Sequence, residues 1–217
     1  MPSKAEIWAL IIFGILFLLI GFVSGIFTYL GLILIGAGLY LGLRPGGILR
    51  KEQVLESWGM LIENGQGKYD KVFQDTENFI EESKAPSLET WKDQMAPGII
   101  GSFFGEKRDF LVVKAQQSSM LKPYQIFVNA RDYGNNLDVS WYLTYRPSIL
   151  EALLSLFRLG GSALALSELD LFELQDLTAY TTVCHHSTLK AVGKLMLALD
   201  QDPSKIDRKS KGFLGIS

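Results

Sequence analysis

The stretch from Ile7 to Leu43 constrains this chain most, because its thirty-seven residues include no Asp, Glu, Lys, Arg or His. A single helix of that length would measure about 55 Å at ~1.5 Å per residue, well over the ~30 Å hydrocarbon core of a bilayer. Ser24-Gly25 offers a bend within the stretch, since glycine adopts turn dihedrals that other residues resist. The pattern therefore predicts a transmembrane hairpin with helices over residues 7–23 and 27–43.

The charges that flank this stretch predict its orientation. Lys4 precedes the hairpin and Arg44, Arg50 and Lys51 follow it, so all four would lie on the same side of a two-pass protein. The positive-inside rule makes that side cytoplasmic. We therefore expect an integral membrane protein, in contact with membrane lipid, with both termini and the soluble part in the cytoplasm. A signal peptide is the alternative for the first segment, and the second apolar segment that follows directly disfavours it.

Five glycines of the hairpin are expected at packed helix seams. They recur at intervals of four and seven residues, and small residues at such intervals let helices approach closely. The spacing leaves open whether the seam lies within the hairpin or against another chain. The predicted helix-packing residues are Gly14, Gly21, Gly25, Gly38 and Gly42.

The rest of the chain has the composition of one near-neutral domain. The sequence holds 21 Lys plus Arg and 23 Asp plus Glu, which gives no basic footprint for nucleic acid. The single cysteine, Cys184, excludes an internal disulfide. We expect a short linker over residues 44–48 and an α+β domain over 49–202. A basic tail over 203–217 is expected to be extended or disordered.

Hydrophobic periodicity predicts a central antiparallel meander covered by helices. Helices are predicted over 49–64, 68–82, 149–159 and 176–199, with a short helical turn over 86–91. Strands are predicted over 110–116, 124–131 and 137–146, with a possible fourth over 100–104. In the third strand, apolar and polar residues alternate, so one face is expected on the core and the other toward water or a partner.

A thiol and imidazoles come together only at Cys184-His185-His186, which contains both histidines of the chain. Adjacent helix residues point about 100° apart, so these side chains do not converge on one ion. No further Cys or His is present to complete a zinc site. Cys184 also falls on the apolar stripe of the last predicted helix, where a buried, unreactive thiol is the ordinary explanation. We expect no catalytic, cofactor or metal site here.

Two further patterns are weak candidates for a site. The glycine-rich residues 101–107 differ from a phosphate-binding loop in spacing, and no Ser or Thr follows Lys107. Asp170 with Glu173 is typical of a capping box at the start of a helix rather than of an acid–base pair. The carboxylates that gather in this region are Glu168, Asp170, Glu173 and Asp176.

The helix predicted over 149–159 is apolar around most of its circumference. A helix that covers a sheet needs an apolar stripe of only ~100°, so the surplus requires another contact unless neighbouring segments enclose it. The candidate interface residues are Ile149, Leu150, Leu153, Leu156 and Phe157.

Three functions remain compatible with the sequence. The favoured one is a non-catalytic structural or accessory subunit of a membrane-associated assembly, which presents its α+β domain to other protein subunits or to a second copy. The second is a binding module for a lipid or other apolar ligand, which would require a closed, dry, apolar cavity. The third, a membrane-bound enzyme that uses Cys184 and a histidine, is least favoured because no catalytic constellation accompanies these residues.

Overall fold

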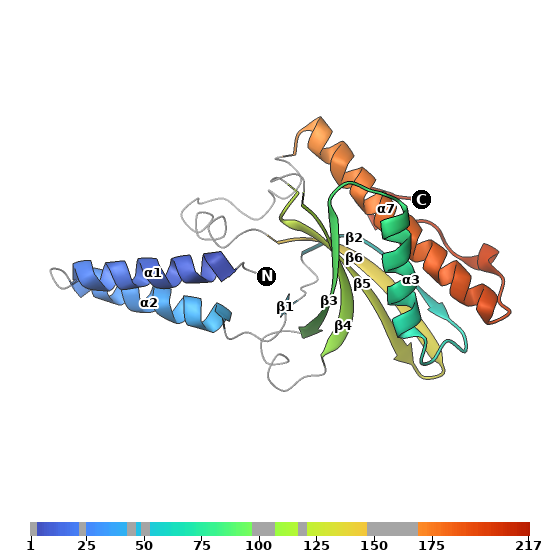
Figure 1. Ribbon diagram of the computed structural model, residues 1–217, viewed down its shortest axis with the longest axis horizontal. Coiled ribbons are helices and arrows are strands. Elements are labelled where there is room, and N and C mark those ends of the chain that lie inside the picture. The colour runs from blue at the N-terminus through green and yellow to red at the C-terminus, as the bar shows by residue number, and fades with distance from the viewer. Residues whose placement is uncertain are drawn as a thin grey trace. The chain divides into compact units, whose positions relative to one another are not determined.

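The computed structural model describes residues 4–21, 25–42, 47–48, 53–96, 107–116, 121–146 and 169–217. The chain divides into two compact units, Met1–Gly47 with Pro147–Leu159 and Ile48–Arg146 with Gly160–Ser217, and each is described by itself. The elements are labelled in Figure 1. The strand predicted over 100–104 and the helix over 149–159, with its candidate interface residues, lie outside the described residues.

The apolar N-terminal stretch forms two helices, α1 (Lys4–Gly21) and α2 (Gly25–Gly42), of 18 residues each. The prediction that they span a membrane is wrong, because none of the helices in the described part of the chain has both the length and the apolar character to do so. The uncharged part of α1, residues 7–21, measures about 22 Å and α2 about 27 Å, both less than a hydrocarbon core of ~30 Å. The predicted location as an integral two-pass membrane protein, with both termini in the cytoplasm, is therefore not supported either.

Glycines lie where α1 and α2 approach each other most closely. A Cβ atom on Gly14 would lie 2.6 Å from Ile35 Cγ1, and one on Gly31 would lie 2.7 Å from the Gly14 carbonyl oxygen. A Cβ atom on Gly38 would lie 2.8 Å from Ile11 Cγ1. Gly31 was not among the predicted packing residues, although it lies seven residues before Gly38. The side-chain surroundings of three predicted packing residues lie outside what the structure describes: Gly21, Gly25 and Gly42.

The outward faces of α1 and α2 are apolar. Their large exposed side chains include Trp8, Ile12, Phe13, Leu19, Tyr29 and Ile33. The packing of the two helices on each other therefore accounts for only part of their apolar composition.

The sheet has the strand order β1-β3-β4-β5-β6-β2-β7. Its strands are β1 (Gly47–Ile48), β2 (Val54–Ile62), β3 (Leu88–Ala96), β4 (Arg108–Ala115), β5 (Tyr124–Tyr133), β6 (Asn136–Tyr145) and β7 (Lys211–Gly212). Strands β4, β5 and β6 pair antiparallel in chain order, so the predicted meander is confirmed.

The helix predicted over 49–64 is wrong, because this segment contains β2. Glu56, Trp58 and Ile62 are buried while Gly59 and Leu61 between them are exposed, which is the period of two of a strand. Residues 54–62 pair with β6, whose residues lie more than 70 positions later in the chain. This long-range pairing outweighs the local preference of Leu, Glu and Met for a helix.

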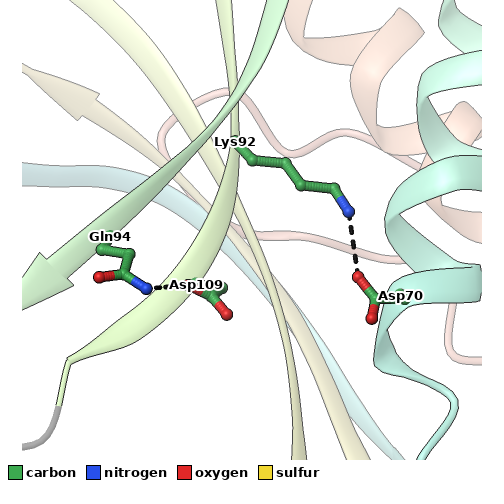
Figure 2. A network of polar contacts seen from close by, with 4 residues as sticks. All are labelled: Asp70, Lys92, Gln94 and Asp109. Carbon is green, nitrogen blue, oxygen red and sulfur yellow. Dashed lines mark hydrogen bonds and ion pairs between the residues drawn. The ribbon is translucent and has the colours of Figure 1, made fainter.

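The helical turn predicted over 86–91 is also wrong, because β3 begins at Leu88. β3 pairs in continuous register with β4, from Leu88 opposite Ala115 to Met95 opposite Arg108. Side chains of β3 also contact the neighbouring helix and strand (Figure 2). Lys92 Nζ lies 3.0 Å from Oδ1 of Asp70 in the helix over residues 69–82, and Gln94 Nε2 lies 2.9 Å from Oδ1 of Asp109 in β4. An exposed ion pair contributes less than about 1 kcal/mol, so strand pairing decides the conformation here.

Two helices, α3 (Tyr69–Glu82) and α7 (Leu171–Ala198), cover one face of the sheet (Figure 1). The helix predicted over 68–82 is confirmed by α3. α7 begins earlier than predicted, at a capping box in which Glu173 N donates to Asp170 Oδ1 over 2.8 Å and Asp170 N donates to Glu173 Oε2 over 3.0 Å. The predicted capping role of this pair is therefore confirmed.

The opposite face of the sheet is buried as well. Ser140 and Thr144, expected to face water or a partner, are 5% and 0% exposed. The Arg146 guanidinium lies 4.7 Å from the centre of the Phe127 ring, and burial lowers its pKa while Asp93 opposes the change. The apolar cluster of this face consists of Met95, Phe110, Val112 and Phe127.

Tyr180 joins α7 to two strands at once. Its hydroxyl donates to the Val113 carbonyl oxygen over 2.6 Å and accepts from the Ile126 N–H over 3.2 Å. The side chain is buried, and this burial raises the pKa of the phenol. Tyr180→Phe would leave both backbone groups without this partner, so we expect the free energy of unfolding to fall by about 1–3 kcal/mol in urea titrations. The more exposed Tyr69→Phe is the control, and equal effects of the two substitutions would contradict this assignment.

Candidate functional site

The C-terminal residues 203–217, expected to be extended or disordered, pack against the domain. They contain a 3-10 helix, η2 (Pro203–Lys205), and β7, which pairs antiparallel with β2. Ile216 near the end is only 5% exposed. We call residues 206–216 the C-terminal strap.

A buried carboxylate anchors the strap. Glu56 on β2 is 0% exposed, and its carboxylate accepts hydrogen bonds from the Leu214 N–H over 2.7 Å and from the Ser210 hydroxyl. Gly212 has φ +153°, and a Cβ atom there would lie 2.4 Å from the Leu55 carbonyl oxygen and 2.5 Å from Glu56 Oε2. The strap therefore requires glycine at this position.

His185 is a second anchor of the strap. Its Nδ1 lies 3.1 Å from Trp141 Nε1, and its Nε2 lies 2.8 Å from the Arg208 carbonyl oxygen. Because the indole N–H can only donate, Nδ1 must accept and Nε2 must carry the proton that is donated to Arg208. Burial lowers the pKa of His185, and His186 acts in the same direction, whereas the Arg208 carbonyl and Glu56 act against it. This geometry requires a neutral imidazole that connects α7 to the strap.

The three residues of the Cys-His-His cluster point into different surroundings. Cys184 is 0% exposed in the core, and burial raises the pKa of its thiol. His185 faces Trp141 and the strap, whereas His186 is exposed. Within the described ranges, no three residues among His, Cys, Asp and Glu are placed to hold a metal ion. The glycine-rich residues 101–106 lie outside the described residues.

A groove of about 400 Å³ lies between α7 and the C-terminal residues, partly open to solvent. Its lining residues are His186, Leu189, Lys190, Gly193, Pro203, Ile206 and Arg208. His186, Lys190 and Gly193 follow one another at intervals of four and three on one face of α7. Leu189, Pro203 and Ile206 supply apolar surface, Lys190 and Arg208 supply positive charge, and none of the described lining residues is acidic.

Gly193 has no backbone reason to be glycine. It lies inside α7, where glycine costs roughly 0.5–1 kcal/mol relative to alanine. A Cβ atom there would lie 3.7 Å from Ile206 Cδ1 and 3.8 Å from Pro203 Cβ, which are ordinary contacts. A large side chain would instead occupy the space between α7 and these two residues. Gly193 therefore lines the groove and lets Pro203 and Ile206 lie close to α7, at a cost in helix stability.

The sequence alone does not predict this groove. One of its walls belongs to the tail that was expected to be disordered, and Glu56, which anchors that wall, was placed in a predicted helix. A glycine within a long periodic helix, one turn after Lys190 and two turns after His186, is the signal available in the sequence.

Comparisons with protein-family models, with curated proteins and with solved structures find no match. The function is therefore inferred from the groove and the strap alone.

Proposed function

We propose that the protein is a non-catalytic accessory subunit whose groove between α7 and the C-terminal residues binds a segment of a partner protein. The apolar walls would bury one or two apolar side chains of that segment. Lys190 and Arg208 would pair with carboxylates beside them. We therefore expect a partner segment that carries both apolar and acidic side chains.

The observation that carries this proposal is Gly193. A glycine that lowers helix stability without a conformational need is typical of a position that another group approaches closely, and Gly193 is such a position in the groove lining. Pro203 and Ile206 lie close to Gly193, and the cations Lys190 and Arg208 line the groove beside them.

The other two candidate functions receive less support. A closed, dry cavity would favour an apolar ligand, whereas this groove is open and lined by cations. An enzyme would need Cys184 or His185 in contact with solvent, and both side chains are 0% exposed. Cys184 is also kept as the neutral thiol by the raised pKa, so it is a poor nucleophile.

The binding test uses labelled twelve-residue peptides that combine two Leu or Phe with three or four Glu. We expect them to bind the full chain, and to bind at least ten-fold more weakly when every Glu is replaced by Gln. Gly193→Phe should fill the groove and the pair Lys190→Glu and Arg208→Glu should reverse its charge, each weakening binding at least ten-fold.

Gly193→Ala is the matched control for the groove. Its Cβ atom makes only ordinary contacts, so it should keep binding while raising the free energy of unfolding by about 0.5–1 kcal/mol. Peptide binding that Gly193→Phe leaves unchanged would contradict the proposal. If the groove binds laurate but none of the peptides, its ligand is an apolar anion and the proposal of a partner protein is wrong.

A further inference from the structure

The hydrogen bonds that hold the C-terminal strap involve mainly its main chain, while Ile206 and Leu214 pack against the core cluster and Ile216 is buried. Trp58 Nε1 donates to the Asp207 carbonyl oxygen, and His185 Nε2 donates to the Arg208 carbonyl oxygen. In the other direction, the Phe213 N–H donates to the Leu55 carbonyl oxygen over 3.4 Å, and the Leu214 N–H donates to Glu56. Contacts of this kind do not depend on which side chains the bound segment carries.

Three positions of the strap show a requirement for a particular residue: Ser210, Gly212 and Gly215, the last because its φ of +58° lies in the left-handed region. The Ser210 hydroxyl donates to Glu56 and also accepts from the Ile216 N–H over 2.8 Å, which closes the strap into a short loop. Gly212 is required because a Cβ atom would collide with Leu55 and Glu56. A fitting segment therefore carries a hydroxyl residue two positions before a glycine, a second glycine three positions after the first, and an apolar residue directly after the second glycine.

The receiving groups belong to elements that the rest of the domain holds in place. Glu56 and Trp58 lie on β2, which pairs with β6 along its length, and His185 lies on α7 with its ring against Trp141. A buried carboxylate is costly unless it accepts hydrogen bonds, so Glu56 needs donors from whatever segment lies over it. These groups form a preorganised site for a peptide.

We propose that this site is a peptide-binding site, which the strap occupies within its own chain, and that a partner-protein segment with Ser or Thr two positions before Gly displaces the strap. This inference goes beyond the groove proposed above, because the receiving groups are Glu56, Trp58 and His185 rather than the groove lining. The two sites are nevertheless coupled, because Ile206 and Arg208 of the strap line the groove. Displacement of the strap would therefore dismantle the groove.

The experiment uses a labelled peptide with the sequence of residues 206–217 and the full chain. In the wild-type chain the strap competes at a local concentration in the millimolar range, so we expect weak binding. Gly212→Val should release the strap without altering the receiving groups, and the peptide should bind this variant at least ten-fold more tightly. Adding Glu56→Gln to Gly212→Val should reverse that gain, as should a peptide with Val in place of Gly212.

Several outcomes would overturn the inference. A folded Gly212→Val chain that binds the peptide no better than the wild type would do so, as would a gain that survives Glu56→Gln. If Gly212→Val unfolds, Ser210→Ala takes its place, and unfolding of both would make the strap a fixed part of the fold. If the wild-type chain is a dimer and the peptide dissociates it, the site is occupied by the strap of a second copy and not by a partner protein.

The experiments distinguish a failure of the proposed peptide-binding site from a failure of the proposed function of the groove. Gly193→Phe should leave binding of a strap peptide shortened to residues 207–217 to the Gly212→Val chain unchanged, because Gly193 contacts the strap at Ile206 and not at the receiving groups. Loss of acidic-peptide binding in Gly193→Phe, with no effect of Gly212→Val on the strap peptide, would retain the groove and overturn only the peptide site.

Discussion

Replacing Trp141 by alanine is expected to lower the free energy of unfolding by about 3–5 kcal/mol, because the substitution removes a whole buried indole. Trp141 is 0% exposed and belongs to the core cluster between the sheet and the two helices. Its Nε1 also supplies the donor to His185 Nδ1, so the substitution leaves this buried acceptor without its partner. A small domain has only about 5–15 kcal/mol of stability, so the variant should lie close to unfolding at 37 °C.

Two controls separate the contributions at Trp141. Trp141→Phe retains most of the ring volume and loses only the donor, so its cost should be about 1–3 kcal/mol. Trp8→Ala removes an indole that is 62% exposed and should cost less than about 1 kcal/mol. The measurement is urea unfolding followed by far-ultraviolet circular dichroism. A cost for Trp141→Ala that does not exceed that of Trp8→Ala would contradict the placement of Trp141 in the core.

Gly31→Leu is expected to separate α1 from α2. A Cβ atom at this position would lie 2.7 Å from the Gly14 carbonyl oxygen and 2.9 Å from Leu18 Cγ, so the backbone of α1 would have to move. Overpacking of this kind typically costs about 1–3 kcal/mol, and more where backbone is the obstacle. Gly36→Leu is the matched control in the same helix, since no atom lies within 4 Å of a Cβ atom built there.

The separation can be read from a disulfide across the helix pair. Ile11 and Gly38 are in contact, so Ile11→Cys with Gly38→Cys should form a disulfide on mild oxidation. We expect Gly31→Leu to lower its yield several-fold and Gly36→Leu to leave it unchanged. Equal yields in the two backgrounds would show that the helices do not pack at Gly31.

Local sequence patterns predict those helices and strands in which apolar residues recur with one regular spacing along the whole element. Residues 137–146 alternate between apolar and polar side chains, and residues 68–82 keep their apolar residues on one side, so β6 and α3 were both placed correctly. Asp170 and Glu173 were recognised because a capping box is completed within four residues.

Elements that depend on distant partners were not predictable in this way. Residues 54–62 carry Leu, Glu and Met, which suit a helix, and only their pairing with β6 makes them a strand. The tail has the basic, polar composition of a disordered segment, yet Glu56 and His185, distant in the sequence, hold it in place. The tail forms one wall of the groove, so the groove could not be predicted from a sequence pattern that indicates a disordered tail.

The transmembrane prediction is wrong because an absence of charge does not by itself give a helix the length that a bilayer requires. The charge-free stretch forms two helices as predicted, but α1 begins before that stretch, with Lys4, Ala5 and Glu6, and ends at Gly21. Length and charge in the sequence could not show where each helix would begin and end. The spacing of the glycines predicted helix packing better than the absence of charge predicted a membrane span. The close approaches of α1 and α2 lie at Gly14, Gly31 and Gly38, and Gly14 and Gly38 were predicted.

A nuclear magnetic resonance titration of the isotopically labelled full chain with the acidic, apolar peptide tests most directly whether the groove binds a partner segment. We expect the backbone shifts to concentrate on groove residues such as Lys190, Gly193 and Arg208, and to disappear in Gly193→Phe while persisting in Gly193→Ala. Shifts that concentrate on α1 and α2, or that persist in Gly193→Phe, would contradict a binding role for the groove.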